Sequence, residues 1–177
     1  RATARARPAC DRGAWFTATP GTCRAATGWG RGLPPAADNR SKWPYAGPLL
    51  TSIEVGCAQI DGTSAAYRDL LTIRTTEPVF SLATADEVQS KLSFPLSGKD
   101  ETPGVITMEL GDLVVVLNAT PQRQEQTVAD LAGKAYALHP VQAAGADPVV
   151  KTSSYAEDSG TFAVPGRTVG IFSRVGR

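Results

Sequence analysis

The sequence contains few of the residues on which many catalytic and metal sites depend. It has one histidine, His139, one methionine and three cysteines among its 177 residues. A single histidine excludes a histidine cluster for a metal ion. Cys10, Cys23 and Cys57 lack a C-x-x-C spacing, so neither a zinc site nor a redox pair is predicted. Cys10 and Cys23 could form a disulfide in an oxidising compartment, or the thiols could all be free.

Charge of one sign and long apolar runs are also missing. The 18 Lys and Arg residues nearly balance 17 Asp and Glu residues, leaving a net charge of +1. A chain without a basic excess is not expected to bind nucleic acid. No run approaches the ~20 apolar residues of a membrane helix, and the first residues contain no apolar segment typical of a signal peptide. We therefore expect a globular chain with neither a nucleic-acid nor a membrane partner.

The first 28 residues differ in composition from the rest of the chain. Arg, Ala, Thr, Gly, Pro and Cys dominate them, and Leu, Ile, Val, Lys and Glu do not occur. Such a composition supports neither helical nor strand periodicity, so residues 1–28 are predicted to be irregular or disordered. A second interpretation is a stretch rich in G and C codons that is read partly out of frame.

Residues 29–50 are predicted to form a loop, because four prolines interrupt any regular helix. Trp29, Trp43 and Tyr45 could dock this loop onto a globular body or stack on a ligand.

Two helices are predicted further along the chain. The first begins at about residue 63 with Ser64 as its N-cap, continues to about Arg74 and is stopped by Pro78. The second, ending near residue 92, begins with a capping box of Thr84 and Glu87. The apolar positions with helical spacing in the first are Tyr67, Leu70, Leu71 and Ile73.

After Phe94 the pattern changes to short strands separated by turn residues. Gly111-Asp112 predicts a tight hairpin, and Asp158-Ser159-Gly160 and Pro165-Gly166 predict turns. Several short strands without a long intervening helix indicate an antiparallel β-sandwich. The predicted strands are Gly104–Leu110, Leu113–Ala119, Glu125–Val128, Ala135–Leu138, Val149–Tyr155, Thr161–Val164 and Thr168–Ser173. The predicted core residues are Val105, Ile106, Met108, Leu113, Val115, Leu117, Leu138, Val149, Phe162, Val169 and Ile171.

No arrangement of residues predicts a catalytic, cofactor or metal site. His139 follows a strand, where we interpret it as a buried, hydrogen-bonded side chain rather than a general base. The glycines at positions 28–32 lack the Lys-Ser/Thr of a phosphate-binding loop. The acidic pairs Asp86/Glu87 and Asp100/Glu101 are interpreted as solvated surface carboxylates, because neighbouring residues do not share a helix face. No dense cluster of oxygen ligands predicts calcium.

A series of segments nevertheless resembles the C-terminal end of pullulanase-type α-1,6-glucosidases of the α-amylase superfamily, glycoside hydrolase family 13. The segments occur in the family's order over roughly residues 29–175. They are Trp29-Gly30, Gly32–Pro44, Tyr67–Arg74, Thr84–Gln89, Leu92–Phe94, Thr102–Thr107, Asp112–Pro121, Tyr136–Gln142, Asp147–Lys151 and Thr161–Phe172.

This resemblance implies a mainly β fold, with a C-terminal antiparallel β-sandwich preceded by the last helix and loops of a truncated (β/α)8 barrel. Residues 1–28 would be a poorly matching segment, residues 29–93 a remnant of the catalytic barrel, and residues 94–177 the sandwich domain. The missing catalytic barrel would be the packing partner of the sandwich.

The resemblance also implies a function for the full-length enzyme. Family members hydrolyse α-1,6-glucosidic bonds of pullulan, amylopectin and glycogen with two aspartates and a glutamate, which the resemblance places upstream of Arg1. The chain alone is thus expected to be inactive, structural and without a cofactor. An extracellular or periplasmic location is implied by resemblance only.

One substrate-binding residue, Trp15, is implied in the amino-terminal segment. Residues 11–18 stand where the family has a stretch like DSGDWFNR, and Trp15 and Phe16 match it. The expected aspartate, asparagine and arginine are Ala14, Thr17 and Ala18, so charge-assisted hydrogen bonds to sugar are lost there.

Two other interpretations remain at this point. The chain could be a non-catalytic carbohydrate-binding β-sandwich module, although such modules need two or three exposed aromatic rings on one surface. It could also be a misassembled product without a function of its own.

Overall fold

The computed structural model describes residues 40–45, 57–99 and 101–176. The chain divides into two compact units, Arg1–Ser64 and Ala65–Arg177. The first contributes one 3-10 turn, η2 (Arg40–Lys42), and the start of a helix to the described residues. The second contains the sheets that position every side chain discussed below. The predictions for residues 1–28 and for Trp29 fall outside the described residues.

The predicted first helix is longer than expected. Helix α3 spans Cys57–Thr76, so the assignment of Ser64 as its N-cap is wrong. The hydroxyl of neighbouring Thr63 donates to the carbonyl of Gln59 at 2.7 Å, which satisfies it inside a continuing helix instead of at a cap. The predicted stop is confirmed: α3 ends at Thr76, and Pro78 opens the 3-10 turn η3 (Pro78–Ser81).

The second predicted helix is confirmed together with its capping box. Helix α4 spans Ala85–Lys91, and the hydroxyl of Thr84 accepts from the backbone N–H of Glu87 at 3.2 Å. The Glu87 carboxylate in turn accepts from the backbone N–H of Thr84 at 3.1 Å.

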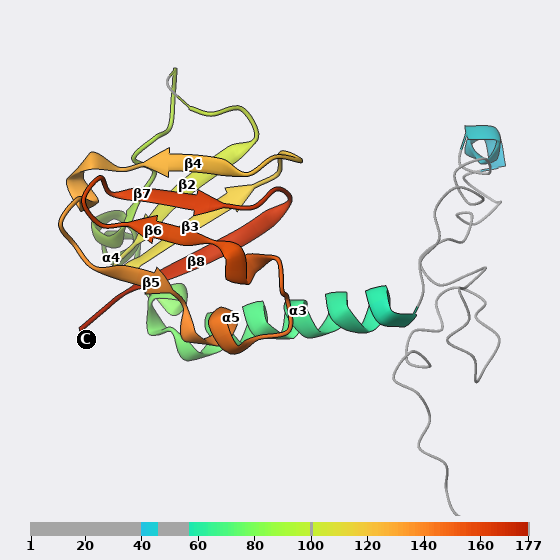
Figure 1. Ribbon diagram of the computed structural model, residues 1–177, viewed down its shortest axis with the longest axis horizontal. Helices are drawn as coiled ribbons and strands as arrows, with labels where there is room; N and C mark the ends of the chain where they lie inside the picture. The colour runs from blue at the N-terminus through green and yellow to red at the C-terminus, as the bar shows by residue number, and fades with distance from the viewer. Residues whose placement is uncertain (1–39, 46–56, 100, 177) are drawn as a thin grey trace, which may run out of the picture. The chain divides into compact units, whose positions relative to one another are not determined.

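The predicted β-sandwich is present as two antiparallel sheets (Figure 1). The larger sheet has five strands in the order β1-β2-β3-β8-β5, and the smaller has three in the order β4-β7-β6. The hairpin at Gly111-Asp112 is confirmed, and Gly111 has the positive φ of 61° that favours glycine. The strands are β1 (Leu92–Ser93), β2 (Val105–Leu110), β3 (Leu113–Asn118), β4 (Gln124–Thr127), β5 (Tyr136–Leu138), β6 (Ser154–Ala156), β7 (Thr161–Val164) and β8 (Thr168–Arg174).

One predicted strand is mostly wrong. Of Val149–Tyr155, only the last two residues belong to β6, and the segment before them forms the 3-10 turn η5 (Val150–Thr152). Val150 lies in this turn and is buried, so an apolar residue here is explained by packing and does not indicate a strand. Other short elements were not predicted either, among them the turn η3, the two-residue strand β1 (Leu92–Ser93), η4 (Ala129–Leu131) and α5 (Pro140–Ala144).

The first core fills the space between the two sheets. Alternate residues of β3 and β8 point into it and meet Phe162 and Val164 of β7. Leu96, Tyr136 and Tyr155 pack against its border. Its buried members are Val105, Val114, Val116, Val128, Leu131, Phe162, Val164 and Phe172.

A second core lies on the other face of the five-stranded sheet, where α3 packs against β3 and β8. Ile73 of α3, Val115 of β3 and Ile171 of β8 are its buried members. The second unit therefore has three layers: α3 with α5, the five-stranded sheet, and the three-stranded sheet (Figure 1). Partly buried side chains around this core are Leu70, Phe80, Met108, Leu117, Val141 and Val169.

Of the eleven predicted core residues, five are buried and four are partly buried, and the prediction is wrong at two. Ile106 and Val149 are each 47% exposed. Ile106 faces outward on β2 beyond the area that α3 covers, and Val149 precedes a turn instead of lying in a strand. The prediction also missed Val114 and Val116, because β3 is buried on both faces.

Candidate functional site

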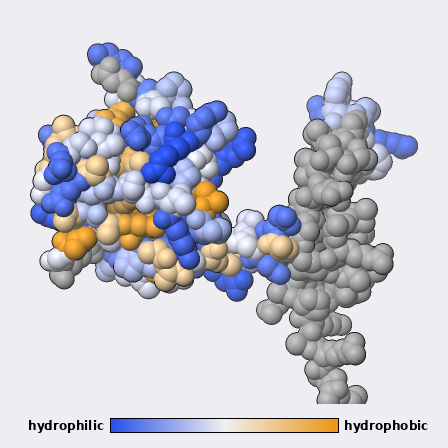
Figure 2. Space-filling view, viewed as in Figure 1, coloured by the Kyte–Doolittle hydropathy of each residue, from blue (hydrophilic) through white to orange (hydrophobic). Residues whose placement is uncertain are grey.

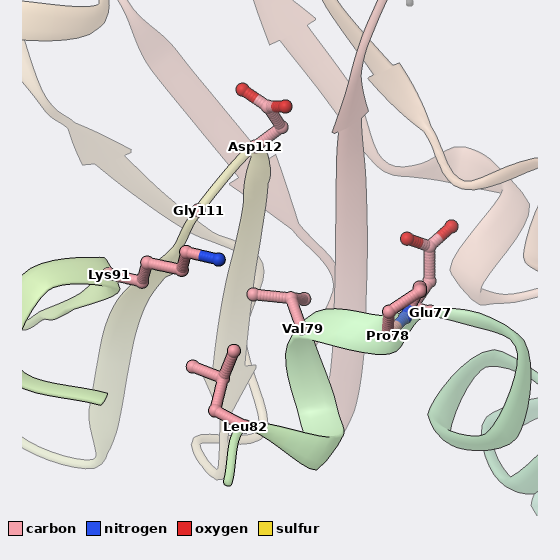
Figure 3. A pocket seen from close by; sticks show the side chains of 7 residues that line it. All are labelled: Glu77, Pro78, Val79, Leu82, Lys91, Gly111 and Asp112. Carbon is pink, nitrogen blue, oxygen red and sulfur yellow. The ribbon is translucent and has the colours of Figure 1, made fainter. Parts of the chain in front are cut away.

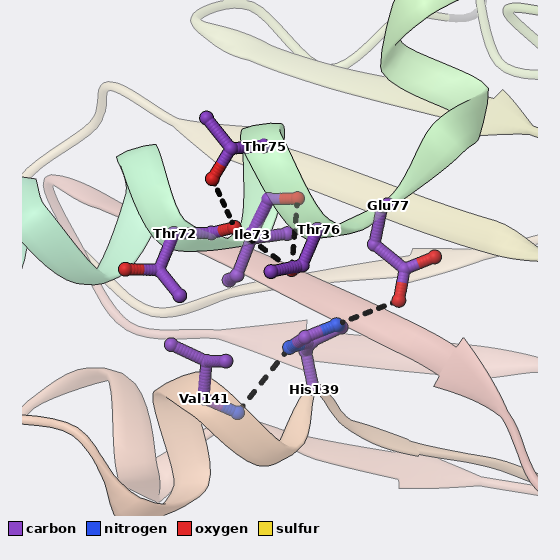
Figure 4. Close-up of polar contacts among 7 residues, drawn as sticks. All are labelled: Thr72, Ile73, Thr75, Thr76, Glu77, His139 and Val141. Atoms are coloured by element: carbon purple, nitrogen blue, oxygen red, sulfur yellow. Dashed lines mark hydrogen bonds and ion pairs between the residues drawn. The ribbon is translucent and has the colours of Figure 1, made fainter.

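The only histidine lies where β5 leads into α5, and its predicted burial is confirmed. His139 is buried and forms the N-cap of α5, with its Nδ1 accepting from the backbone N–H of Val141 at 3.3 Å. Its Nε2 lies 3.2 Å from Oε1 of Glu77 (Figure 4). Since Nδ1 accepts, Nε2 carries the proton and donates to the carboxylate.

Glu77 follows α3 directly, so this contact joins the end of α3 to the sheet. The backbone N–H of Glu77 donates to the carbonyl of Ile73 at 2.9 Å, and that of His139 donates to the carbonyl of Ile171 at 2.8 Å. Both ring nitrogens of His139 are engaged within the protein. The side chain therefore holds α3 against the sheet and has no nitrogen aimed at a substrate, which agrees with its interpretation as a structural residue.

A cavity of about 370 Å³ lies between η3 and the β2–β3 hairpin. Pro78, Val79 and Leu82 form one side, and the charged residues are Glu77, Lys91 and Asp112. The two carboxylates come from separate elements and do not point toward one another (Figure 3). Glu77 faces His139, and Asp112 lies 3.9 Å from the guanidinium of Arg174. The cavity thus lacks a facing carboxylate pair of the kind used in glycoside hydrolysis.

A second cavity, of about 190 Å³, separates α3 from the β7–β8 turn, and its carboxylates have structural roles. Oδ2 of Asp69 accepts from the backbone N–H of Ala146, and Oδ1 of Asp147 accepts from that of Val149, each at 2.8 Å. Gly145 passes so close to Asp69 that a Cβ at position 145 would collide with the carboxylate. These contacts fix the loop after α5 against α3.

Two buried amides also hold backbone in place, and the sequence analysis gave neither a role. Nδ2 of Asn118 donates to the carbonyls of Gln122, Val164 and Pro165 at 2.8, 3.1 and 2.9 Å. The amide of Gln142 donates from Nε2 to the carbonyl of Val169 and accepts at Oε1 from the N–H of Ile171, both at 2.8 Å. The sequence signal that could have indicated such a role is Asn118 itself, a polar residue in an otherwise apolar strand.

The acidic residues predicted to be solvated are at the surface where the structure describes them. Asp86, Glu87 and Glu101 are exposed, and Asp100 lies outside the described residues. Hydrogen bonds from the side chain and backbone of Thr84 hold the pKa of Glu87 below its usual 4.5. The shift reflects helix capping and not a catalytic environment.

The aromatic side chains of the sheets pack against each other. Phe162 contacts Tyr155, Phe172 and Tyr136 with ring centroids 4.5, 5.0 and 5.7 Å apart. Phe162 and Phe172 are fully buried, as expected, and burial raises the pKa of the Tyr155 hydroxyl. That hydroxyl lies 2.7 Å from the carbonyl of Leu131. The cluster is part of the inter-sheet core and does not form a sugar-stacking surface.

Several predictions fall on parts of the chain that are not described. Trp15 and Trp29 lie outside the described residues, as do Cys10, Cys23 and the side chain of Cys57. Among residues 40–45, 57–99 and 101–176, no three His, Cys, Asp or Glu side chains gather in a way that could hold a metal ion. No helix in the described part is long and apolar enough to cross a membrane.

The two antiparallel sheets and the helix packed on one of them define a mainly β domain. The sequence profile of the family described as "Alpha-1,6-glucosidases, pullulanase-type, C-terminal" matches residues 24–175. The chain belongs to this family.

Two relatives and a solved structure are similar to the chain. It is 33% identical to pullulanase 1, chloroplastic, of Arabidopsis thaliana, over 94% of the chain and 19% of the relative. It is 24% identical to the pullulanase of Klebsiella pneumoniae, over 93% of the chain and 16% of the relative. The maltotriose complex of PulA from Klebsiella pneumoniae has the same fold, with a TM-score of 0.70, 23% identity and coverage of 82% of this chain and 17% of that one. The chain thus spans less than a fifth of the length of each of these proteins.

Proposed function

We propose that this chain is the non-catalytic C-terminal portion of an enzyme that hydrolyses α-1,6-glucosidic bonds in α-glucans such as pullulan, amylopectin and glycogen. Its catalytic carboxylates would lie in the part of the enzyme that precedes it. The role of the chain itself would be structural.

The observation that carries this proposal is the family match over residues 24–175. The contacts of the acidic residues agree with it. Glu77, Asp69 and Asp147 are engaged with His139, Ala146 and Val149. Glycoside hydrolysis requires two carboxyl groups about 5–10 Å apart on either side of the scissile bond, one of them free to donate a proton. Residues that are committed to the fold in this way are poor candidates for that chemistry.

We also propose the domain arrangement that the sequence resemblance implied. Residues 29–93 would derive from the end of a catalytic (β/α)8 barrel, with α3 as its final helix, and residues 94–177 would form the sandwich domain. Ile73 supports this arrangement, because the helix before the sandwich shares a core with it. A barrel that ends in α3 would be tied to the sandwich through that core.

A carbohydrate-binding module is the alternative, and the aromatic residues of the second unit argue against it. Four of them form the core cluster, and the two of this unit that are clearly exposed, Tyr67 at 63% and Phe94 at 45%, belong to α3 and the loop after β1. Tyr45, which is 78% exposed, belongs to the first unit. Titration with maltooligosaccharides, followed by tryptophan fluorescence, tests this alternative. A binding module would saturate below millimolar sugar.

The proposal is tested by assaying the purified chain for release of reducing sugar from pullulan. We expect no turnover, because the reacting carboxylates are not on this chain. Turnover by the wild-type chain that survives removal of contaminating hydrolases would overturn the proposal.

A further inference from the structure

His139 differs from the surface residues of the second unit because it is both buried and able to change its charge near neutral pH. On the face that Figure 2 shows, apolar side chains are scattered among polar ones, as is normal for a protein surface. The side chain of His139 is only 6% exposed, and it is the only imidazole of the chain. Histidine ordinarily changes its charge between pH 5 and 8. A moderate change of pH therefore acts on this ring inside the fold.

The two contacts of the ring determine which nitrogen carries the proton. A backbone N–H can only donate, so Nδ1 accepts from Val141 at 3.3 Å and has no proton of its own. Nε2 lies 3.2 Å from Oε1 of Glu77 and carries the single proton of the neutral ring (Figure 4). The observed contacts thus require a neutral imidazole in one of its two tautomers.

A second proton would affect the two contacts in opposite ways. A proton taken up from solvent at Nδ1 turns this acceptor into a donor, which then faces the N–H donor of Val141. The hydrogen bond from Nε2 to Glu77 becomes a charge-assisted one and is strengthened. Acid therefore breaks the link from the ring to α5 and strengthens its link to the end of α3.

Helix α5 is the element that loss of this cap would loosen. It is only five residues long, so it depends on its contacts more than on its own hydrogen bonds. Its first turn is held by the His139 cap and by Val141, which packs against the core beneath α3. Gln142 is bonded to Val169 and Ile171 of β8 independently of the ring. Loss of the cap should thus free the first turn and leave the contact with β8 in place.

Glu77 is the charged residue in direct contact with the ring. Helix α5 carries no titratable side chain, and the nearest part of β8 contributes only the backbone carbonyl of Ile171. Arg174 at the end of β8 lies 3.9 Å from Asp112. The other charged or titratable side chains described on the adjoining elements are Asp61, Tyr67, Arg68, Asp69 and Arg74 of α3, Tyr136 of β5, and Lys91 and Asp112, which line the cavity beside Glu77.

We propose that His139 is a pH-sensitive clamp on α5. With a neutral ring, Nδ1 caps α5 and keeps Val141 on the core beneath α3. As the pH falls and the ring gains its second proton, the cap is lost and the first turn of α5 is released, while Glu77 keeps the ring bound to the end of α3. The stabilisation of α5 is thus present at the higher pH and lost at the lower one. This inference goes beyond the proposed function and does not depend on it, because it follows from contacts within the chain.

The test is NMR spectroscopy of the full 177-residue chain without a histidine tag, so that His139 supplies the only imidazole signals. At pH 8 the ring nitrogen shifts should place the proton on Nε2. Between pH 8 and 5 the amide protection of Val141 should fall about fivefold, as expected for the loss of a helix cap, with the same midpoint as the imidazole titration. Protection of the β7 amides should stay within about twofold, because β7 does not contact the ring.

Two variants separate the parts of the clamp. In Glu77→Gln the side-chain oxygen still accepts from Nε2 but carries no charge, so the transition of α5 should move to lower pH by about one unit. In His139→Asn the side chain can still cap a helix but does not titrate, so the protection of α5 should be constant from pH 8 to 5. Because position 139 is buried, the wild type and Glu77→Gln decide the result if His139→Asn does not fold.

Several results would overturn the clamp. A proton on Nδ1 at pH 8 would contradict the cap itself, and protection of α5 that does not follow the imidazole titration would remove the coupling. A loss of protection in β7 as large as that in α5 would indicate unfolding of the whole sandwich. An unchanged transition in Glu77→Gln would contradict the part assigned to the carboxylate. The proposed function fails separately, through pullulan hydrolysis by the chain alone.

Discussion

The two faces of the five-stranded sheet are completed in different ways. The inner face is closed by the three-stranded sheet, and all buried members of its core come from residues 105–172. The outer face is covered by α3, which precedes the strands, and the buried cluster beneath the helix has only three members, Ile73, Val115 and Ile171. The inner core is thus supplied by the sandwich alone, whereas the outer core depends on a helix from the preceding part of the chain.

The two cores are therefore expected to have different roles: the inner core stabilises the sandwich, and the outer core holds α3 on it. Burial of apolar area stabilises at roughly 25 cal/mol per Å², so the inner core, with Phe162, Phe172 and five valines, should contribute most of the free energy of folding. The outer core should contribute less free energy of folding, but it determines whether α3 stays packed on the sheet. Substitutions can test the two contributions separately.

The largest effect is expected in the inner core. Phe162→Ala should lower the free energy of unfolding by about 3–5 kcal/mol, because it removes a fully buried ring that touches three other aromatic residues. Urea denaturation followed by far-UV circular dichroism measures this loss. The matched control, Ile106→Ala on the outer side of β2, should cost less than about 1 kcal/mol, and equal costs would contradict the comparison.

A smaller effect is expected in the outer core. Ile73→Ala should cost about 2–3 kcal/mol, at the low end for a buried isoleucine, because partly buried Leu70, Phe80 and Met108 can move into the space. Amide hydrogen exchange should show protection falling more in α3 than in β7. Uniform loss of protection in both elements would mean that the two cores unfold as one.

The smallest effect is expected at α4, which belongs to neither core. Hydrogen bonds from Thr84 lower the pKa of Glu87 from its usual 4.5, so the charged form stabilises the folded helix. This contribution is fully present above pH 4.5 and is lost as the pH falls through the lower folded-state pKa. Glu87→Gln should therefore differ from the wild type in α4 amide protection at pH 7 but converge with it near pH 3. A difference in α4 amide protection that does not change with pH would show that the carboxylate of Glu87 is not its cause.

Local patterns in the sequence predicted the elements whose determinants are local. The capping box of Thr84 and Glu87 is completed by atoms three residues apart, and the Gly111-Asp112 hairpin depends on one backbone conformation. Strands β2, β3, β7 and β8, which are rich in apolar and β-branched residues, were also predicted, with ends within a few residues of those observed. These features could be predicted because no distant part of the chain decides them.

The errors occur where distant contacts decide the structure. The double-sided burial of β3 requires α3 on one face, which no alternation within Leu113–Asn118 could reveal. Val149–Tyr155 is rich in β-formers, yet it forms a 3-10 turn in which Val150 is buried, and the side chain of Asp147 holds the backbone N–H of Val149 just before it. The buried place of His139 was predicted from its strand-end position, but Glu77, 62 residues away, could not be identified as its partner.

The side-chain amide of Gln142 has a consequence for how the five-stranded sheet ends. Beyond the three residues that pair with β5, strand β8 meets this amide, which bonds a carbonyl and an N–H two residues apart as a neighbouring strand would. The edge is therefore occupied by a group that cannot itself be extended by another strand. A single glutamine thus completes the edge of β8 beyond β5, and its replacement by leucine would leave the carbonyl of Val169 and the N–H of Ile171 without these hydrogen bonds.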